Sequence, residues 1–108
     1  MSLQLSPLEL AARLRAPHPP RLLDVREPEE NSLAALPRST LIPLGQLDAR
    51  AGEIAAWKEE EMVVYCHHGL RSLHAIHLLE QRGFTRLRNL AGGIDRWTLE
   101  VDPSLPRY

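Results

Sequence analysis

Short apolar runs alternate with polar and turn-rich stretches along the 108-residue chain, and the spacing within each run indicates its secondary structure. Runs of consecutive apolar residues are typical of strands buried on both faces, because neither side of such a strand meets water. The expected strands cover residues 3–5, 21–25, 40–42, 62–65 and 87–90.

Two segments carry the start and stop signals of helices. Residues 6–9 (SPLE) have the form of a capping box with proline at the first helical position, and this helix should end by Ala16, before a proline-rich stretch. Residues 71–82 place apolar side chains on one face and are followed by Gly83, a residue common just after a helix end. Weaker helical patterns cover residues 44–57 and the stretch that starts at Gly92-Gly93 and ends at Asp102.

Two polar stretches lie between these elements. Residues 26–30 are expected to form a polar stretch at the end of a strand, followed by a loop that includes Pro37. Residues 58–61 (KEEE) are expected to form a solvated connector, because long charged side chains are rarely buried.

The alternation of strands and helices along the whole length predicts an α/β domain. Its sheet should be mostly parallel, with about five strands and with helices on both faces, which makes three layers. A chain of 108 residues is long enough for one domain, and no linker or internal repeat interrupts it. Residues 1–108 are therefore expected to form a single domain.

Composition and charge narrow the class of protein. The chain is 44% hydrophobic and 25% charged with a net charge of −1, which gives no sign of a basic stripe for nucleic acid or for a membrane surface. The single cysteine excludes an internal disulfide. Residues 1–20 lack the basic start and apolar centre of a signal peptide, and no apolar run is long enough to span a bilayer. We therefore expect a cytoplasmic protein.

Chemistry is expected where the predicted strands end. Ligands of open parallel sheets bind outside the carboxyl ends of the strands, and Cys66 lies just past the strand at residues 62–65. Asp24 and Arg26 lie at or just past the end of the strand at residues 21–25. The sequence thus predicts that a thiol, a carboxylate and a guanidinium gather near one edge of the sheet.

The segment from Cys66 to Ser72 joins a strand end to the start of a helix. A tight turn at Gly69 can direct several backbone N–H groups into one concavity, and a helix that begins near Arg71 adds its positive end. Both effects favour a thiolate over a thiol, and Arg71 can bind an anionic substrate. The pattern indicates a sulfur nucleophile in a cradle suited to anions.

This loop is one of four segments in which the chain resembles single-domain rhodaneses. Residues 66–72 (CHHGLRS) match the active-site loop C-x-x-G-x-R-S of that family. The other matches are residues 22–30 (LLDVREPEE) with L-D-V-R-x-x-x-E, residues 42–44 with I-P-L, and residues 90–97 (LAGGIDRW) with the closing G-G-x-x-x-W signature. The resemblance covers nearly the whole chain and implies the rhodanese-like α/β fold.

The resemblance implies a thiosulfate sulfurtransferase that works through a persulfide on Cys66, with no metal or organic cofactor. Asp24 and Arg26 would support the site from a second motif. The active-site loop, which would bind the donor, would consist of His67, His68, Gly69, Leu70, Arg71 and Ser72.

The implied partners are small molecules or a sulfur-carrier protein, and neither nucleic acid nor a membrane is expected. The donor would be a thiosulfate-like anion, and the acceptor would be cyanide, a thiol or a carrier protein. Because the chain has one cysteine, the sulfur must leave to an external acceptor. Residues 97–108 also resemble the ends of rhodanese domains linked to sulfur-carrier activation, which is a weaker indication.

The chain departs from the family pattern in one loop. Between Glu30 and Pro43 the family usually carries G-H-I-x-G-A, whereas this chain has AALPRS at residues 34–39. The geometry of this loop, and any partner that it meets, stays open. The roles of His67 and His68 also stay open: they tune the field around the cysteine, line the entrance, or serve only as loop donors.

Cys66 has two other interpretations that do not involve catalysis by the thiol. A lone cysteine is often a small buried hydrophobe. A metal site is a second alternative, but the nearby histidines follow no familiar zinc spacing; they are His67, His68, His74 and His77.

Two alternatives concern function. Tyrosine-type phosphatases and arsenate reductases commonly use H-C-x-x-x-x-x-R, whereas here Tyr65 precedes the cysteine and four residues separate Cys66 from Arg71. The shorter loop suits a sulfur atom better than a tetrahedral phosphate. The last alternative is a non-catalytic rhodanese-like module for regulation or interaction, a class that often lacks the cysteine.

Overall fold

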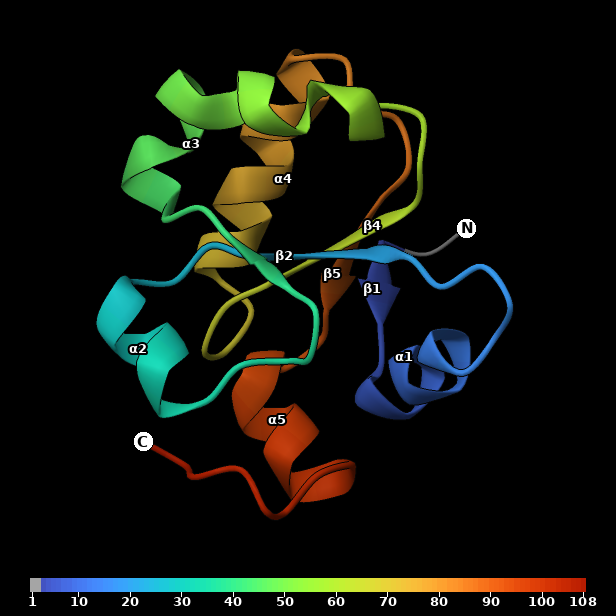
Figure 1. Ribbon diagram of the computed structural model, residues 1–108, viewed down its shortest axis with the longest axis vertical. Coiled ribbons are helices and arrows are strands. Elements are labelled where there is room, and N and C mark those ends of the chain that lie inside the picture. The colour runs from blue at the N-terminus through green and yellow to red at the C-terminus, as the bar shows by residue number, and fades with distance from the viewer. Residues whose placement is uncertain (1–2) are drawn as a thin grey trace.

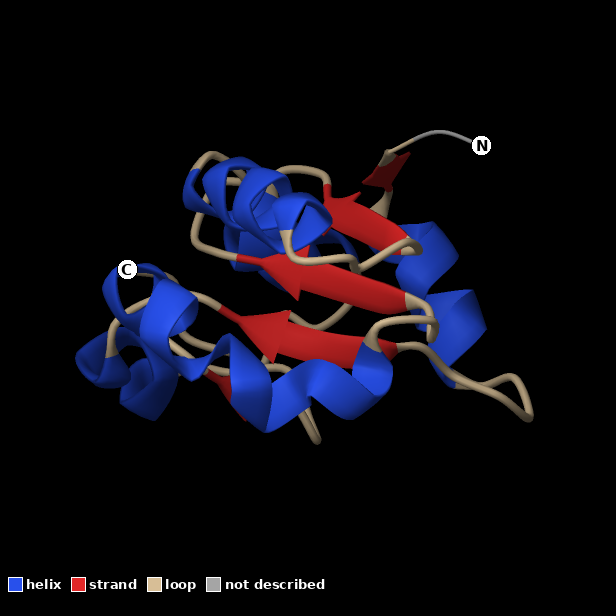
Figure 2. Cartoon of the chain, turned by 90° about the horizontal axis from the view of Figure 1, so that it is seen from above, coloured by secondary structure: helices blue, strands red, loops and turns tan. Residues whose placement is uncertain are grey.

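In the computed structural model, which describes residues 3–108, a five-stranded sheet lies between two layers of helices (Figures 1 and 2). The strands are β1 (Gln4–Leu5), β2 (Arg21–Asp24), β3 (Thr40–Leu41), β4 (Met62–Tyr65) and β5 (Leu87–Leu90). The helical segments are α1 (Pro7–Leu14), α2 (Pro28–Leu33), α3 (Leu44–Arg50), the 3₁₀ segment η1 (Ala51–Trp57), α4 (Arg71–Gln81) and α5 (Gly93–Glu100).

Each pair of neighbouring strands is parallel, in the order β1-β5-β4-β2-β3. β4 is therefore the central strand, with β5 on one side and β2 on the other. Val64 of β4 is in register with Leu23 of β2 and with Asn89 of β5. The predicted α/β class, with a parallel sheet of five strands and helices on both faces, is confirmed.

The central strand shows why the sheet needs a helical layer on each face. Met62 and Val64 pack into one apolar cluster with α3, η1 and α4, whereas Val63 and Tyr65 pack into a second cluster with α1 and α5. All four side chains are fully buried. Burial of a large apolar side chain stabilises the fold by roughly 1.5–3 kcal/mol. Figure 1 shows α3 and α4 on one side of the sheet and α1 and α5 on the other.

Helix α2 corrects the expectation of a continuous loop after residues 26–30. Its start carries a local signal, because Pro28 occupies the first helical position and the Glu27 N–H donates to Glu30 Oε1 at 3.0 Å. None of its residues is buried. The helix therefore lacks an apolar stripe, and a search for hydrophobic periodicity misses it.

The charged run at residues 58–61 is a solvated connector only in part. Lys58, Glu59 and Glu60 are exposed as expected, but the Glu61 side chain is only 9% exposed. Glu61 pairs with Arg13 of α1 and lies 3.8 Å from Arg88 of β5. Its burial is compatible with its charge because two guanidinium groups face it.

The topology places a switch point between β4 and β5. The chain leaves β4 for α4, which covers one face of the sheet, and leaves β5 for α5, which covers the opposite face. In open parallel sheets, ligands usually bind beside such a divergence of neighbouring connections, at the carboxyl ends of the strands. Among the helices of residues 3–108, none is long and apolar enough to cross a membrane.

Candidate active site

The sulfur of Cys66 lies at the carboxyl end of β4, inside the turn that leads into α4. The N–H groups of Gly69 and Ser72 donate to Sγ at 3.0 and 3.4 Å. Gly69 has a φ of +99°, a backbone conformation that residues with a side chain rarely adopt. Glycine therefore permits the turn that directs the Gly69 N–H at the sulfur. Two converging N–H donors beside the start of a helix form a cradle for an anion.

Ser72 and Asn89 form a buried polar pair behind the sulfur. The Ser72 hydroxyl lies 3.4 Å from Cys66 Sγ and donates to Asn89 Oδ1. The amide nitrogen of Asn89 donates to the Gly69 carbonyl at 3.4 Å and to Gln4 Oε1 at 2.9 Å. Asn89 therefore links the loop, the start of α4 and β1, and holds both sides of the cradle in place.

The start of α5, at Gly92 and Gly93, packs against the cysteine loop. The N–H groups of Ile94 and Asp95 donate to the carbonyls of Cys66 and His67 at 2.9 and 3.1 Å. Gly93 has a φ of +65°, and a Cβ at this position would lie 2.3 Å from the His67 carbonyl oxygen. The G-G signature thus allows the start of α5 to pack directly against the backbone of the cysteine loop.

Arg71, the first residue of α4, forms a bidentate ion pair with Glu30 of α2. Nη1 and Nη2 donate to the two carboxylate oxygens at 2.6 and 2.9 Å, and the Arg71 side chain remains 38% exposed. The hydrogen bonds from Arg71 lower the pKa of Glu30 to about 2, so the carboxylate stays ionised at neutral pH. Two parallel charge-assisted bonds fix the guanidinium beside the loop.

Asp24 and Arg26 form a second ion pair, which is fully buried. Arg26 donates to both carboxylate oxygens of Asp24, at 2.9 and 2.8 Å, and to the Ala34 carbonyl at 2.6 Å. Burial opposes the charge of Arg26, but the hydrogen bonds with Asp24 and Tyr108 outweigh it and raise the pKa of Arg26. Because side chains alternate along β2, Asp24 lies on the same face of the sheet as Leu22, which packs with α1 and α5. Leu23 lies on the opposite face.

Tyr108 lies across the cysteine loop. Its hydroxyl accepts from Arg26 Nη1 at 2.7 Å and donates to Glu30 Oε2 at 2.8 Å. Its ring stacks on His67 at 3.9 Å between ring centroids, and His67 in turn lies 3.9 Å from His68. In Figure 1 the C-terminal segment returns toward α2, which carries Glu30.

The two histidines of the loop have different surroundings. Burial, together with the neighbouring His68, lowers the pKa of His67, so its ring is neutral at neutral pH. Nε2 of His67 is buried without a hydrogen-bond partner among residues 3–108. The His68 side chain is 62% exposed, and its Nδ1 lies 4.0 Å from Asp95. Leu70, at the tip of the loop, is also exposed.

The atypical loop at residues 34–39 is anchored in the core. Leu36 is buried, and its N–H donates to the Tyr65 hydroxyl at 3.1 Å. The Ser39 hydroxyl lies 2.9 Å from the same Tyr65 oxygen. Tyr65, the last residue of β4 and the neighbour of Cys66 in sequence, therefore holds this loop in place.

We expect the Tyr108→Phe substitution to lower the free energy of unfolding by about 1–2 kcal/mol, because it removes hydrogen bonds to two charged groups. Phenylalanine keeps the ring stacked on His67, so the loss reports on the hydroxyl alone. Urea denaturation with an unchanged slope measures it. A change below about 0.3 kcal/mol would show that water replaces both hydrogen bonds without cost.

Sequence reasoning gave no role to three residues that contact this site. Glu30 belongs to the quoted L-D-V-R-x-x-x-E match, and its acidic side chain at the start of α2 was the available signal. Asn89 is a polar residue near the carboxyl end of the buried strand β5, at the same end of the sheet as Cys66. Tyr108 offered no local signal, since its contacts are with residues distant in sequence.

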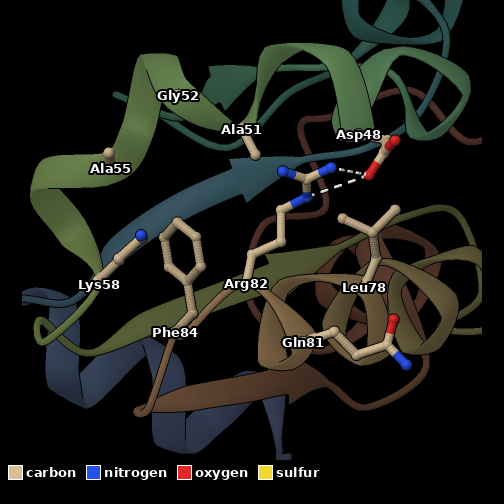
Figure 3. A pocket seen from close by; sticks show the side chains of 9 residues that line it. All are labelled: Asp48, Ala51, Gly52, Ala55, Lys58, Leu78, Gln81, Arg82 and Phe84. Atoms are coloured by element: carbon tan, nitrogen blue, oxygen red, sulfur yellow. Dashed lines mark hydrogen bonds and ion pairs between the residues drawn. The ribbon is translucent and has the colours of Figure 1, made fainter.

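One surface groove lies away from the cysteine loop. A groove of about 430 Å³ runs between the α3–η1 segment and the end of α4 (Figure 3). Figure 3 shows Arg82 reaching across it to pair with Asp48, with Phe84 beside Lys58. No residue of the cysteine loop lines this groove, so it is separate from the candidate active site.

Comparisons with known proteins agree with this geometry. The model of the rhodanese-like domain matches residues 6–100. Rhodanese-like/PpiC domain-containing protein 12 of Arabidopsis thaliana is 39% identical over 90 residues, which cover 82% of this chain and 30% of that protein. A sulfurtransferase of Allochromatium vinosum is 35% identical over 88 residues, which cover 82% of this chain and 80% of that protein.

The fold is also similar to that of a solved structure. The human single-domain sulfurtransferase TSTD1 superposes with a TM-score of 0.79 at 29% identity, covering 93% of this chain and 98% of that chain. The chain spans 20% to 30% of the length of several curated relatives, which are larger proteins. The family model covers most of the chain, and the chain therefore belongs to the rhodanese-like domain family.

Proposed function

We propose that this protein is a sulfurtransferase that carries sulfane sulfur as a persulfide on Cys66. The observation that carries the proposal is the convergence of the Gly69 and Ser72 N–H groups on the Cys66 sulfur at the carboxyl end of the central strand. The similarity to two proteins named as sulfurtransferases supports it.

In the first half-reaction the Cys66 thiolate attacks the outer sulfur of thiosulfate or of a persulfide donor. A sulfur–sulfur bond forms to Cys66 while the donor's own sulfur–sulfur bond breaks, and its electron pair leaves with sulfite or with the donor thiolate. The cradle of N–H groups holds the negative charge on sulfur. The cycle needs no cofactor, because Cys66 itself carries the transferred atom.

In the second half-reaction a thiophilic acceptor takes the outer sulfur and regenerates the Cys66 thiolate. Cyanide, a small thiol or a sulfur-carrier protein can serve, because each supplies a nucleophile for the outer sulfur. The chain contains no second cysteine that could resolve the persulfide internally. Arg71 lies beside the loop and can orient the donor, whereas Asp24 and Arg26 support the loop at residues 34–39 and Tyr108.

Initial-rate kinetics test this two-step scheme. Thiocyanate formation is measured while thiosulfate and cyanide are varied against each other. A covalent intermediate predicts parallel lines in double-reciprocal plots, because the first product leaves before the second substrate reacts. Lines that intersect would show that both substrates bind before any sulfur moves, which contradicts a Cys66 persulfide as the obligatory intermediate.

A further inference from the structure

The side-chain amide of Asn89 fits its surroundings in only one orientation. Its nitrogen lies 3.4 Å from the Gly69 carbonyl oxygen and 2.9 Å from Gln4 Oε1, and both of these oxygens can only accept. The amide oxygen Oδ1 therefore faces the Ser72 hydroxyl. Asn89 is 2% exposed, so bulk water offers its amide no other partners.

The Ser72 hydroxyl has one proton, and Asn89 accepts it. Because an amide oxygen can only accept, the hydroxyl must be the donor in this contact. The same hydroxyl oxygen lies 3.4 Å from Cys66 Sγ and has only lone pairs left for the sulfur. A lone pair accepts the S–H of a neutral thiol, but it repels the negative charge of a thiolate. The Ser72 hydroxyl thus fits the thiol form of Cys66 better than the thiolate form.

The other groups at the sulfur favour the thiolate. The N–H groups of Gly69 and Ser72 donate to Sγ at 3.0 and 3.4 Å, and the positive end of α4 lies beside them. Arg71 interacts with charge on Cys66, although Glu30 of α2 pairs with its guanidinium. Further titratable groups around the cysteine loop are His67, His68, Asp95, Arg107 and Tyr108.

Ionisation of Cys66 sets the sulfur and Asn89 in competition for the serine proton. When the S–H proton leaves to water, the Ser72 hydroxyl can keep its bond to Oδ1, and then a lone pair faces the thiolate. It can also turn its proton to the sulfur, and then Oδ1 is left buried without that donor, which opposes the change. In both cases the acceptor on Asn89 makes the thiolate less favourable.

We propose that Asn89 is a positioning residue that acts through Ser72: it withholds the serine proton from the Cys66 thiolate and thereby sets the pH at which the nucleophile forms. The inference rests on the proposed function, since Cys66 is the nucleophile of that reaction. Asn89 is not a catalytic residue, because its effect reaches the sulfur only through the serine hydroxyl.

The Asn89→Leu variant tests the inference, because leucine keeps the branched shape of asparagine and removes the acceptor. The rate of Cys66 alkylation by iodoacetamide is followed by intact mass across the pH range in which thiols ionise. Since the thiolate is the reactive form, the rate rises with pH through a midpoint. Without the acceptor, the serine proton can be donated to the thiolate, so we expect the midpoint to move about one pH unit or more toward lower pH.

The direction of this shift separates the proposed role from a purely structural one. If Asn89 only held the cradle together, its loss would weaken the N–H contacts to Sγ and move the midpoint to higher pH. In a Ser72→Ala background, Asn89→Leu should leave the midpoint unchanged, because the hydroxyl through which Asn89 acts is absent. Gln4→Leu is the matched control: it removes a partner of the Asn89 nitrogen but keeps Oδ1 and Ser72, and should not move the midpoint.

Asn89→Asp is a second variant for the case that leucine prevents folding, which urea denaturation would reveal. A carboxyl group still offers an oxygen that accepts the serine proton. This variant should therefore leave the midpoint unchanged or move it to higher pH.

An unchanged or higher midpoint in folded Asn89→Leu would overturn the inference. So would a shift to lower pH in Asn89→Asp, or a shift in Asn89→Leu that persists without the Ser72 hydroxyl. Failure of the proposed function looks different. In that case Cys66 is still alkylated with the shifted profile in Asn89→Leu, but the wild-type protein gains sulfur from neither thiosulfate nor an alkyl persulfide.

Discussion

We expect the Cys66→Ser substitution to lower sulfur transfer by at least about a thousandfold while the fold persists. The attacking atom is the sulfur, and a serine hydroxyl cannot form a persulfide. The smaller oxygen can still accept the N–H groups of Gly69 and Ser72 that now contact Sγ. Thiocyanate formation measures the loss, and circular dichroism with urea denaturation shows that the variant is folded.

The control for this experiment is Ser72→Ala, which removes the hydroxyl 3.4 Å from the sulfur but keeps the nucleophile and both N–H donors. It should retain measurable transfer. If Cys66→Ser transferred sulfur as fast as the wild type, the sulfur would have to be carried by another residue.

The second large effect is expected at Gly93. An alanine Cβ would lie 2.3 Å from the His67 carbonyl oxygen and 2.5 Å from that of Cys66, and the φ of +65° disfavours any side chain. Because both neighbours are backbone atoms, the clash can be relieved only by moving the loop or α5. Gly93→Ala should therefore lower the free energy of unfolding by at least about 3 kcal/mol.

Gly45→Ala is the matched control for this substitution. Gly45 lies in α3, has no positive φ, and a Cβ there meets nothing within 4 Å. Alanine at such a helical position should leave stability unchanged or raise it by about 0.4–1 kcal/mol. Equal effects at the two glycines in urea denaturation would contradict the close approach of α5 to the cysteine loop.

Much of the fold follows from local pattern, because the central strand β4 is a short apolar run and the long helix α4 has a clear apolar face. Strand alternation then assigns Val64 and Cys66 to one face of β4 and Tyr65 to the other. Helix α2 could not be predicted from hydrophobic spacing, since none of its residues is buried. Its capping residues were the usable signal, and hydrophobic spacing could not reveal it.

The candidate site also contains features that could be predicted from the sequence and features that could not. The position of Cys66 and the turn at Gly69 could be predicted, since both depend on a strand end and a neighbouring helix start. The partner of Arg71 could not, because Glu30 lies on a separate helix and is separated by 41 residues in sequence. The stack of Tyr108 on His67 also depends on how a distant segment returns to the loop, which no local pattern records.

The central claim is that Cys66 carries the transferred sulfur, and intact mass measurement tests it most directly. The protein is incubated separately with excess thiosulfate and with an alkyl persulfide, freed of donor, and weighed before and after addition of cyanide. The account predicts that wild-type protein gains the mass of one sulfur atom and loses it to cyanide, and that Cys66→Ser gains none. A wild-type protein that gains nothing from either donor, or a serine variant that gains sulfur equally, would contradict it.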